Sequence, residues 1–159
     1  MLAVELYLLL VLANGAPVIA ARLLKQRWEW PIDGGRLWRD GRPVFGASKT
    51  WRGLVTGALS CAAGSALMAL GAGFGLVFGV LGLLGDLISS FLKRRRGLAS
   101  SARALGLDQL PEAALPMGFA LLWLPLGWLE ALAVVALFAL SNIVFSPLLY
   151  RLGIRRQPH

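Results

Sequence analysis

The chain has 159 residues, of which 57% are hydrophobic and only 15% are charged, with 16 Lys and Arg against 8 Asp and Glu. Soluble domains carry roughly 45–50% apolar and about 25% charged residues, so a single soluble globule of this size is excluded, and the same hydrophobicity excludes intrinsic disorder. Because Cys61 is the single cysteine, a disulfide scaffold is excluded too, and the composition indicates an integral membrane protein with a basic aqueous face.

The first predicted membrane helix lies at the beginning of the chain, at about 2–24. A helix needs about 20 predominantly apolar residues to cross roughly 30 Å of hydrocarbon. Residues 2–21 contain one charged side chain, Glu5, and they have neither the positive start nor the small-residue cleavage site of a signal peptide. We therefore expect a retained membrane helix here.

The next two predicted helices share one uncharged run, residues 54–85, which is too long for a single crossing. Glycines at the middle of the run, Gly71, Gly73 and Gly75, predict a reversal of the chain. Small residues recur along both helices, and such rows let helix backbones approach closely in lipid. They are Gly53, Gly57, Cys61 and Ser65, followed by Gly75, Gly79 and Gly82.

Two further helices are predicted in the last third of the chain, with a turn between them at Pro125 and Gly127. The 17 residues between Glu112 and Glu130 are uncharged, and 20 more follow from 131 to 150. We therefore predict one all-α membrane domain over residues 1–159. Its five transmembrane helices lie at about 2–24, 54–70, 74–92, 113–127 and 129–150, and its polar loops at 25–53 and 93–112.

The basic residues predict the orientation of these helices. All 16 Lys and Arg lie at 22–53, at 93–112 or from Arg151 onwards. Five crossings place these three segments on one side of the membrane, and cationic loops stay in the cytoplasm. We therefore expect the N-terminus outside and the C-terminus in the cytoplasm of a multi-pass protein of the cell (inner) membrane.

Asp86 is the most informative ionisable residue, because it follows a long apolar run inside the third predicted helix, where a charge is costly and usually functional. Ser90 and Arg94 follow at spacings of four, so the three side chains share one helix face, and Lys93 flanks it. A carboxylate can hold Mg²⁺ while cations neutralise phosphate oxygens. The alternative is a structural Asp–Lys or Asp–Arg pair, with Lys93 to Arg96 as a positive anchor, and we assign Arg95 and Arg96 to that anchor.

A second candidate site precedes the second predicted helix, where the sequence from Asp40 reads D-G-R-P-V-F-G-A-S-K-T-W-R-G. Lys49, Thr50 and Arg52 stand just before the helix begins, and cations beside the N–H groups of a helix start form an anion site. A phosphate-binding P-loop is excluded, because that motif needs Gly directly before the Lys, where this chain has Ser48.

A third candidate is Asp108 in the second polar loop, whose carboxylate could complete a metal site with Asp86, although Asp is also an ordinary helix-capping residue. Asp33 and Asp40 are further acids that we interpret as turn residues. The single histidine, His159, is the last residue, so histidine chemistry is excluded. Cations, carboxylates and hydroxyls remain, and these support phosphoryl or nucleotidyl transfer by positioning and charge neutralisation.

These segments resemble the CDP-archaeol synthase family, small membrane cytidylyltransferases related to CDP-diacylglycerol synthases. The similarity covers nearly the whole chain and is carried by residues 14–17, 31–35, the 40–53 block ending in K-T-W-R-G, G-D-L-I-S-S-F-L-K-R-R from Gly85, and Asp108-Gln109. It implies an enzyme that uses Mg²⁺ to join CTP to a lipid phosphate, such as digeranylgeranyl glycerol phosphate, with release of pyrophosphate.

The resemblance also implies a role for each matched residue. Lys49, Thr50, Arg52 and Ser90 would bind the CTP phosphates, Asp86, Lys93 and Arg94 would be catalytic, and Asp86 and Asp108 would hold Mg²⁺. The partners implied are CTP and a lipid phosphate within the bilayer, with no nucleic acid, and the active site would face the cytoplasm. The chain departs from the family at its end, where Arg155 to His159 replace a Lys-rich stretch, and in the Ala- and Ser-rich loop 97–107.

Two other functions are weighed against this one. A CDP-alcohol phosphotransferase would show several Asp at spacings of three and four on one helix, and Asp86 has no such neighbours. A non-enzymatic transporter subunit or scaffold would use Asp86 only in a structural pair with Lys93 or Arg94. It would show no nucleotide dependence.

Overall fold

The computed structural model describes residues 1–99, 104 and 106–151, and this part of the chain is helical, with isolated β-bridges in place of strands. The helices are α1 (Leu2–Leu24), α2 (Trp51–Leu67), α3 (Ala72–Arg95), α4 (Leu110–Trp123) and α5 (Trp128–Arg151). The predicted all-α class with five helices is confirmed. The tail from 152 to 159, with the departure at Arg155 to His159, lies outside the described residues, as do positions 100–103 and 105 of the loop.

Helix α1 has the predicted bounds, and the other four helices begin or end a few residues away from theirs. Helix α2 begins at Trp51 because the Thr50 hydroxyl accepts a hydrogen bond from the Gly53 N–H, at 3.2 Å. Helix α3 continues to Arg95 because cations stabilise a helix C-terminus. Helix α4 ends at Trp123, since Pro125 disfavours a helical residue before it.

Three of the helices, α1, α3 and α5, are long and apolar enough to cross a membrane. Helix α2 has 17 residues and α4 has 14, so both are shorter than the usual 20. Five crossings and the orientation of the termini stay predictions.

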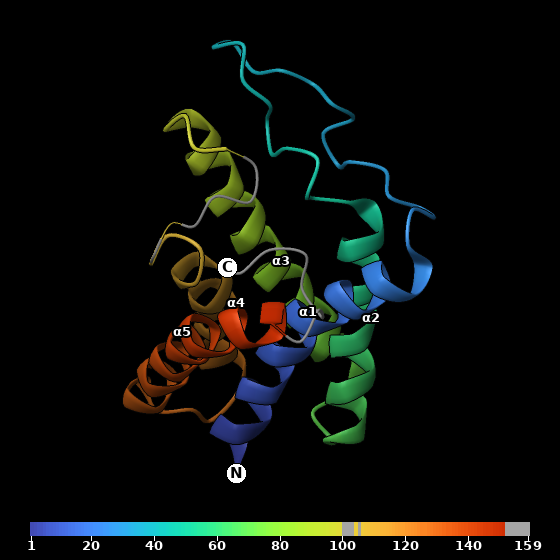
Figure 1. Cartoon of the computed structure of the whole chain (residues 1–159). Coiled ribbons are helices and arrows are strands. Elements are labelled where there is room, and N and C mark those ends of the chain that lie inside the picture. The colour runs from blue at the N-terminus through green and yellow to red at the C-terminus, as the bar shows by residue number, and fades with distance from the viewer. Residues whose placement is uncertain (100–103, 105, 152–159) are drawn as a thin grey trace.

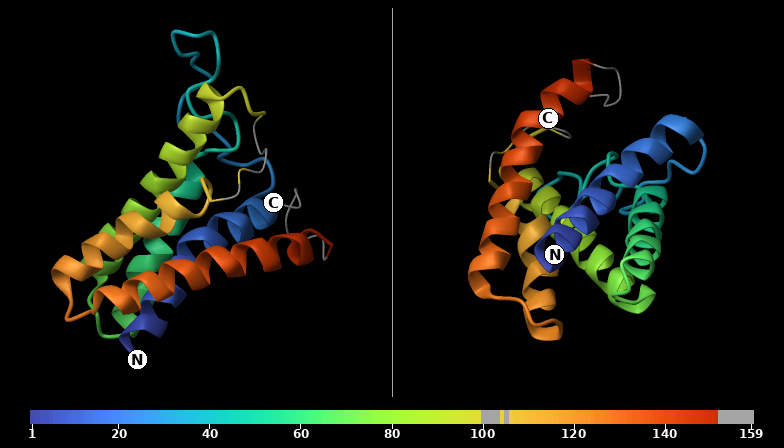
Figure 2. Two further views of the ribbon diagram at one scale, coloured as in Figure 1. Left: turned by 90° about the vertical axis from the view of Figure 1, so that its left-hand side faces the viewer. Right: turned by 90° about the horizontal axis from the view of Figure 1, so that it is seen from below.

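The helices pack in an order that leaves α3 in contact with most of the others. Figure 1 shows α3 rising through the molecule, with α1 and α2 on one side and α4 and α5 on the other. Helix α2 packs against both α1 and α3, and α4 packs against α3. Helix α5 runs obliquely along the outside of the bundle, next to α1 and α4 (Figure 2).

Small residues bring the central helices into very close contact, as their spacing predicts. A methyl group added to Gly75 would lie 2.3 Å from the Cys61 carbonyl oxygen of α2, and one added to Gly57 would lie 2.9 Å from the Ala13 carbonyl oxygen of α1. A methyl group on Gly85 would lie 2.1 Å from the Pro111 carbonyl oxygen of α4. The free cysteine, Cys61, is fully buried in this packing. Backbone contact this close is possible only because these positions lack side chains.

The polar segments gather at one end of the molecule. The 25–50 segment lies above the C-terminal end of α1 and the N-terminal end of α2, close to the C-terminal end of α3 (Figure 1). The N-terminus and the turn between α2 and α3 lie at the opposite end. The candidate site residues therefore come from elements that meet at this polar end.

Candidate active site

The loop before α2 is organised by Asp33, which is only 8% exposed. One carboxylate oxygen accepts hydrogen bonds from the Phe45 and Gly46 N–H groups, both at 2.9 Å, and the other accepts one from the Gly35 N–H at 3.0 Å. Burial raises the pKa of this carboxyl, but the hydrogen bonds from Gly46, Phe45 and Gly35 outweigh burial and leave the pKa below 3.8. Asp33 is thus a turn residue, as predicted, and it also fixes a loop 12 residues away.

Lys49 reaches from the end of this loop to α3. Its ammonium lies 2.5 Å from the Asp86 carboxylate, and both side chains keep part of their surface exposed, 22% and 30%. The backbone on either side is fixed, because the Ile32 N–H donates to the Lys49 carbonyl at 2.8 Å and Thr50 caps α2. The structure thus brings together two residues that the sequence assigned to separate candidate sites.

A second ion pair joins α3 to the loop before α4. The Lys93 ammonium lies 2.5 Å from the Asp108 carboxylate, whose other oxygen accepts a hydrogen bond from the Ala104 N–H at 2.8 Å. Lys93 lies seven residues beyond Asp86 on the same helix, about two helical turns. The Lys49–Asp86 and Lys93–Asp108 pairs thus join α3 to both polar loops, and α3 supplies the carboxylate in the first pair and the lysine in the second.

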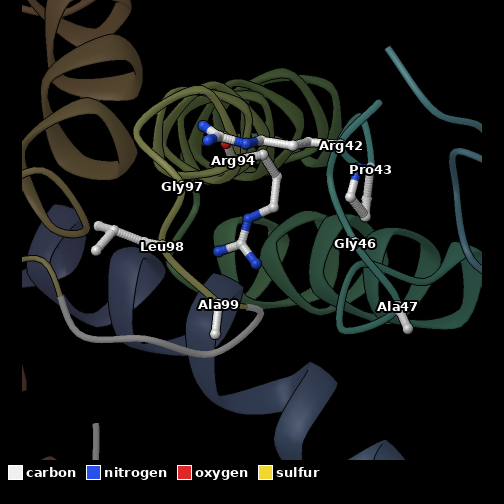
Figure 3. A pocket seen from close by; sticks show the side chains of 8 residues that line it. All are labelled: Arg42, Pro43, Gly46, Ala47, Arg94, Gly97, Leu98 and Ala99. Atoms are coloured by element: carbon white, nitrogen blue, oxygen red, sulfur yellow. The ribbon is translucent and has the colours of Figure 1, made fainter. Parts of the chain in front are cut away.

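Arg94 lies beside this pair and is 4% exposed. Its side chain reaches from α3 into a cavity of about 400 Å³, and Arg42 lies next to the end of the same helix (Figure 3). The Arg94 Nε atom has no hydrogen-bond partner within the described part of the chain. A buried guanidinium facing an open cavity favours an anion as its missing partner. The cavity is lined by Arg42, Pro43, Gly46, Ala47, Arg94, Gly97, Leu98 and Ala99.

Two other predicted residues have different surroundings. Ser90 is 2% exposed, one turn before Arg94 on α3. Arg52 points away from the Lys49–Asp86 pair, because its guanidinium donates to the Lys25 and Arg27 carbonyls just beyond α1, at 2.9 and 2.5 Å. It also lies 3.6 Å from the Glu29 carboxylate. In this structure Arg52 joins the end of α1 to the start of α2.

The charge of the site is positive, since Lys49, Lys93, Arg94 and Arg42 outnumber the carboxylates Asp86 and Asp108. Within the described residues, no group of three His, Cys, Asp or Glu side chains is arranged to hold a metal ion. Arg42 was not among the residues predicted for the site. The D-G-R-P turn sequence around Arg42 was the one feature that could have drawn attention to it. The sequence of this turn does not show that the segment folds back onto α3.

Comparison with known proteins gives one consistent result. The CDP-archaeol synthase of Thermococcus onnurineus is 39% identical over 145 residues, which cover 83% of this chain and 79% of the relative. The CDP-archaeol synthase of Thermococcus kodakarensis is 36% identical over 162 aligned positions, covering 92% and 88%. A solved structure of an intramembrane enzyme for archaeal membrane lipid biosynthesis superimposes with a TM-score of 0.76 at 28% identity, covering 89% of this chain and 90% of the other. No family model matches the chain.

Proposed function

The chain belongs to the CDP-archaeol synthase family, and from that premise we propose that it joins CTP to digeranylgeranyl glycerol phosphate, or a similar lipid phosphate, and releases pyrophosphate. The coarser function follows from the family: the protein is a membrane-embedded cytidylyltransferase of lipid biosynthesis that makes a CDP-lipid. Because the relatives at this level of identity are enzymes, the alternative of a non-enzymatic transporter subunit or scaffold is rejected.

The observation that carries the proposal is the pair of ion pairs on α3. Lys49–Asp86 and Lys93–Asp108 draw both polar loops onto the same half of one helix, beside the cavity that Arg94 enters. Each lysine can exchange its carboxylate partner for a phosphate oxygen, because an ammonium group binds either anion. The backbones of both lysines are meanwhile held in place, Lys93 by α3 and Lys49 by the capped loop. A polyphosphate placed here meets three cations from two elements.

The transfer needs positioning more than acid–base chemistry. An oxygen of the lipid phosphate forms a bond to the α-phosphorus of CTP, and the bond from that phosphorus to the bridging oxygen of the β-phosphate breaks, which releases pyrophosphate. The lipid phosphate is already ionised, so no residue has to remove a proton. Lys49, Lys93 and Arg94 hold the phosphates in line and neutralise the charge on the leaving pyrophosphate.

We propose Mg²⁺ as the cofactor, with Asp86 and Asp108 as its protein ligands. The donor set fits, because Mg²⁺ in nucleotide enzymes takes one or two carboxylates and completes its shell with phosphate oxygens and water. Both carboxylates are reachable, with 30% and 25% of their side-chain surfaces exposed. When bound, the ion would neutralise phosphate charge. Ser90 and Thr50 would line the phosphate site, and Arg52 would support it from the start of α2.

We further propose that all five helices cross the cell membrane, with the N-terminus outside and the site in the cytoplasm. The 17 residues of α2 are about 26 Å long, close to the hydrocarbon thickness, and Trp51 at its start suits the membrane interface. The cations of the 25–50 segment favour the cytoplasmic side.

The proposal is tested by incubating purified protein with α-phosphate-labelled CTP, Mg²⁺ and a panel of lipid phosphates. We expect label in the lipid fraction together with release of unlabelled pyrophosphate, most with digeranylgeranyl glycerol phosphate, less with diacylglycerol phosphate and little with ATP in place of CTP. Label in no lipid of the panel, or equal transfer from ATP, would overturn the proposal.

A further inference from the structure

A small hairpin within the loop docks on the C-terminal end of α3. It spans residues 36–44 and is closed by backbone hydrogen bonds from the Trp38 N–H to the Arg42 carbonyl, at 2.7 Å, and from the Val44 N–H to the Arg36 carbonyl, at 3.1 Å. A two-stranded hairpin of this size is marginally stable alone in water, so its position depends on what holds it against α3.

Arg95 holds the hairpin from the helix side. Its guanidinium forms an ion pair with Asp40 and donates to the Pro43 carbonyl at 2.5 Å. It also lies over the Phe91 ring, 4.9 Å from the centroid, where Trp38 packs edge-on against Phe91 at 5.3 Å. One side chain of α3 thus binds a carboxylate and a carbonyl of the hairpin, and it covers the α3 ring against which Trp38 of the hairpin packs.

Arg42 holds α3 from the hairpin side. Its guanidinium donates to the Arg95 carbonyl at 2.8 Å and to the Arg94 carbonyl at 3.4 Å. These carbonyls belong to the last turn of α3, and the Arg94 carbonyl also accepts a hydrogen bond from the Gly97 N–H at 3.0 Å. Gly97 leaves room for this contact, because an added methyl group would lie 3.3 Å from the Arg42 guanidinium and its φ of +75° favours glycine. Each of the two arginines therefore binds the element that carries the other.

This reciprocal contact, which we call the arginine clamp (Asp40, Arg42 and Arg95), determines the shape of the Arg94 cavity. Pro43, Gly46 and Ala47 form one wall from the loop, and Arg94 of α3 with Gly97, Leu98 and Ala99 just beyond it form the other wall. If the hairpin moves off α3, the two walls separate. Arg42, Arg94, Arg95 and Arg96 also repel one another here, and Asp40 offsets part of this repulsion through its ion pair with Arg95.

We propose that Asp40 and Arg95 are positioning residues for cytidylyl transfer, which hold the cavity of Arg94 in the shape that receives the phosphates of CTP. The inference rests on the proposed function. Arg42 lines the cavity and can touch the nucleotide itself, so the test uses Asp40 and Arg95, which lie outside the lining residues.

The test compares the kinetics of Arg95→Ala, Asp40→Ala and the double variant in the labelled-CTP assay. We expect KM for CTP to rise about tenfold in each single variant, with kcat within about threefold of wild type. A misplaced cavity wall weakens the binding of the substrate and of the transition state by similar amounts. The double variant should be no worse than the worse single variant, since both changes break one interaction. Arg95→Lys, which keeps the charge but not the forked geometry, should lie between wild type and Arg95→Ala.

Arg96→Ala is the matched control, because it removes the same charge from an exposed neighbouring position. We expect its KM for CTP to change by no more than about twofold. An equal rise in KM in Arg96→Ala would show that net charge, rather than the clamp, attracts the nucleotide. An unchanged KM in Arg95→Ala and Asp40→Ala would also overturn the inference.

A second measurement separates this inference from the proposed function. Hydrogen exchange of the backbone in 36–44 should accelerate in Arg95→Ala and Asp40→Ala while exchange in the core of α2 stays as in wild type. If the wild type transfers no label, the proposed function fails, and unchanged exchange in the hairpin then overturns the clamp as well. Accelerated exchange with normal kinetics would show docking without any effect on the nucleotide, which also overturns the positioning role.

Discussion

Acidic side chains at the polar end differ in what their oxygens face. Asp33 is buried, and its two oxygens accept three backbone N–H groups. Asp86 and Asp108 are a quarter to a third exposed, and each has an oxygen that faces a lysine, while the other Asp108 oxygen accepts the Ala104 N–H. A carboxylate whose oxygens are occupied by fixed backbone donors organises a loop, whereas one that shares its oxygens with a movable lysine can exchange partners. We therefore interpret Asp33 as structural and the other two as metal or substrate ligands.

Asp33→Asn should destabilise the protein in a pH-dependent way. An amide has one acceptor oxygen, so its NH₂ group must face either the Gly35 N–H or the Phe45 and Gly46 N–H groups, at a cost of about 1–3 kcal/mol. The folded-state pKa of Asp33 lies below 3.8, so its carboxylate contributes fully above that value. The contribution is lost as the pH falls through the folded-state pKa.

The measurement is thermal unfolding of the wild type and Asp33→Asn in detergent between about pH 3 and 7. We expect a lower Tm for the variant at neutral pH and a gap that narrows as the pH falls below about 4 towards the lowered pKa of the wild-type carboxyl. Taking the difference between the two proteins cancels the titration of the other acids. Equal Tm values at neutral pH, or a gap that widens in acid, would show that Asp33 does not hold the loop as a carboxylate.

Sequence spacing predicted which side chains of α3 share a face, but it did not predict their partners in other elements. Asp86, Ser90 and Arg94 share a face of α3, as the helical period predicts. The partner of Asp86 is Lys49, 37 residues earlier, a contact that no local period encodes. The sequence placed Arg52 in the same candidate anion site as Lys49. In the structure Arg52 lies in the first turn of α2, and its guanidinium binds the backbone at the end of α1 instead. Arg95 was assigned to the membrane anchor, whereas its guanidinium binds the hairpin.

Helix α3 has two different halves. Its first half carries the glycines that bring α2 close, including Gly75 and Gly79, and its last turns carry the ionisable residues. Gly85 stands at the junction, where the backbone of α4 touches α3 directly before Asp86. Asp108 lies just before α4, so the close packing of α4 on α3 also places the Asp108 carboxylate within reach of Lys93.

Gly85→Ala should therefore damage both packing and activity. The new methyl group would lie 2.1 Å from the Pro111 carbonyl oxygen and 2.7 Å from the Glu112 Cα atom, so α4 must move. Overpacking of this kind costs about 1–3 kcal/mol and at times more. We expect a lower Tm in detergent and a loss of cytidylyl transfer from CTP to the lipid phosphate.

Gly73→Ala is the matched control for this substitution. It makes the same change near the start of α3, where nothing lies within 4 Å of the added methyl group. The control should be neutral or stabilising by up to about 1 kcal/mol, because alanine is the better helix former. If the two variants have the same Tm and activity, the close approach of α3 and α4 does not support the site.

The helices themselves were largely predictable, because long apolar runs in a chain of this composition leave few alternatives. The bounds shifted for reasons found at helix ends: the Thr50 cap, the cations of the last turn of α3 and the proline after α4. The hairpin at 36–44 was not predicted. Its short backbone pairing and its contacts with α3 depend on tertiary structure rather than on hydrophobic period.

Across the whole chain, the net charge of +8 divides between two uses. Exposed cations such as Arg22, Lys25 and Arg27 lie on the surface near the end of α1, where they suit the orientation rule for membrane proteins. Lys93 and Arg94 are buried and Lys49 is partly buried, and these three lie at the ion pairs and the cavity. Lys49 and Lys93 already have carboxylate partners, whereas the Arg94 Nε atom has no hydrogen-bond partner within the described residues, so Arg94 is the better indicator of an anionic substrate.

Transfer from labelled CTP by the wild type and by Asp86→Asn, each folded in detergent with Mg²⁺ and the lipid phosphate, tests the proposed site most directly. Glu5→Gln is the matched control, since it makes the same chemical change in the first turn of α1, at the opposite end of the molecule (Figure 1). We expect the wild type and Glu5→Gln to label the lipid equally, and Asp86→Asn, with the same Tm as wild type, to lose at least about 100-fold in rate, beyond the loss typical of a residue that only supports a metal ligand. Wild-type transfer by folded Asp86→Asn would show that the chemistry does not take place at the polar half of α3.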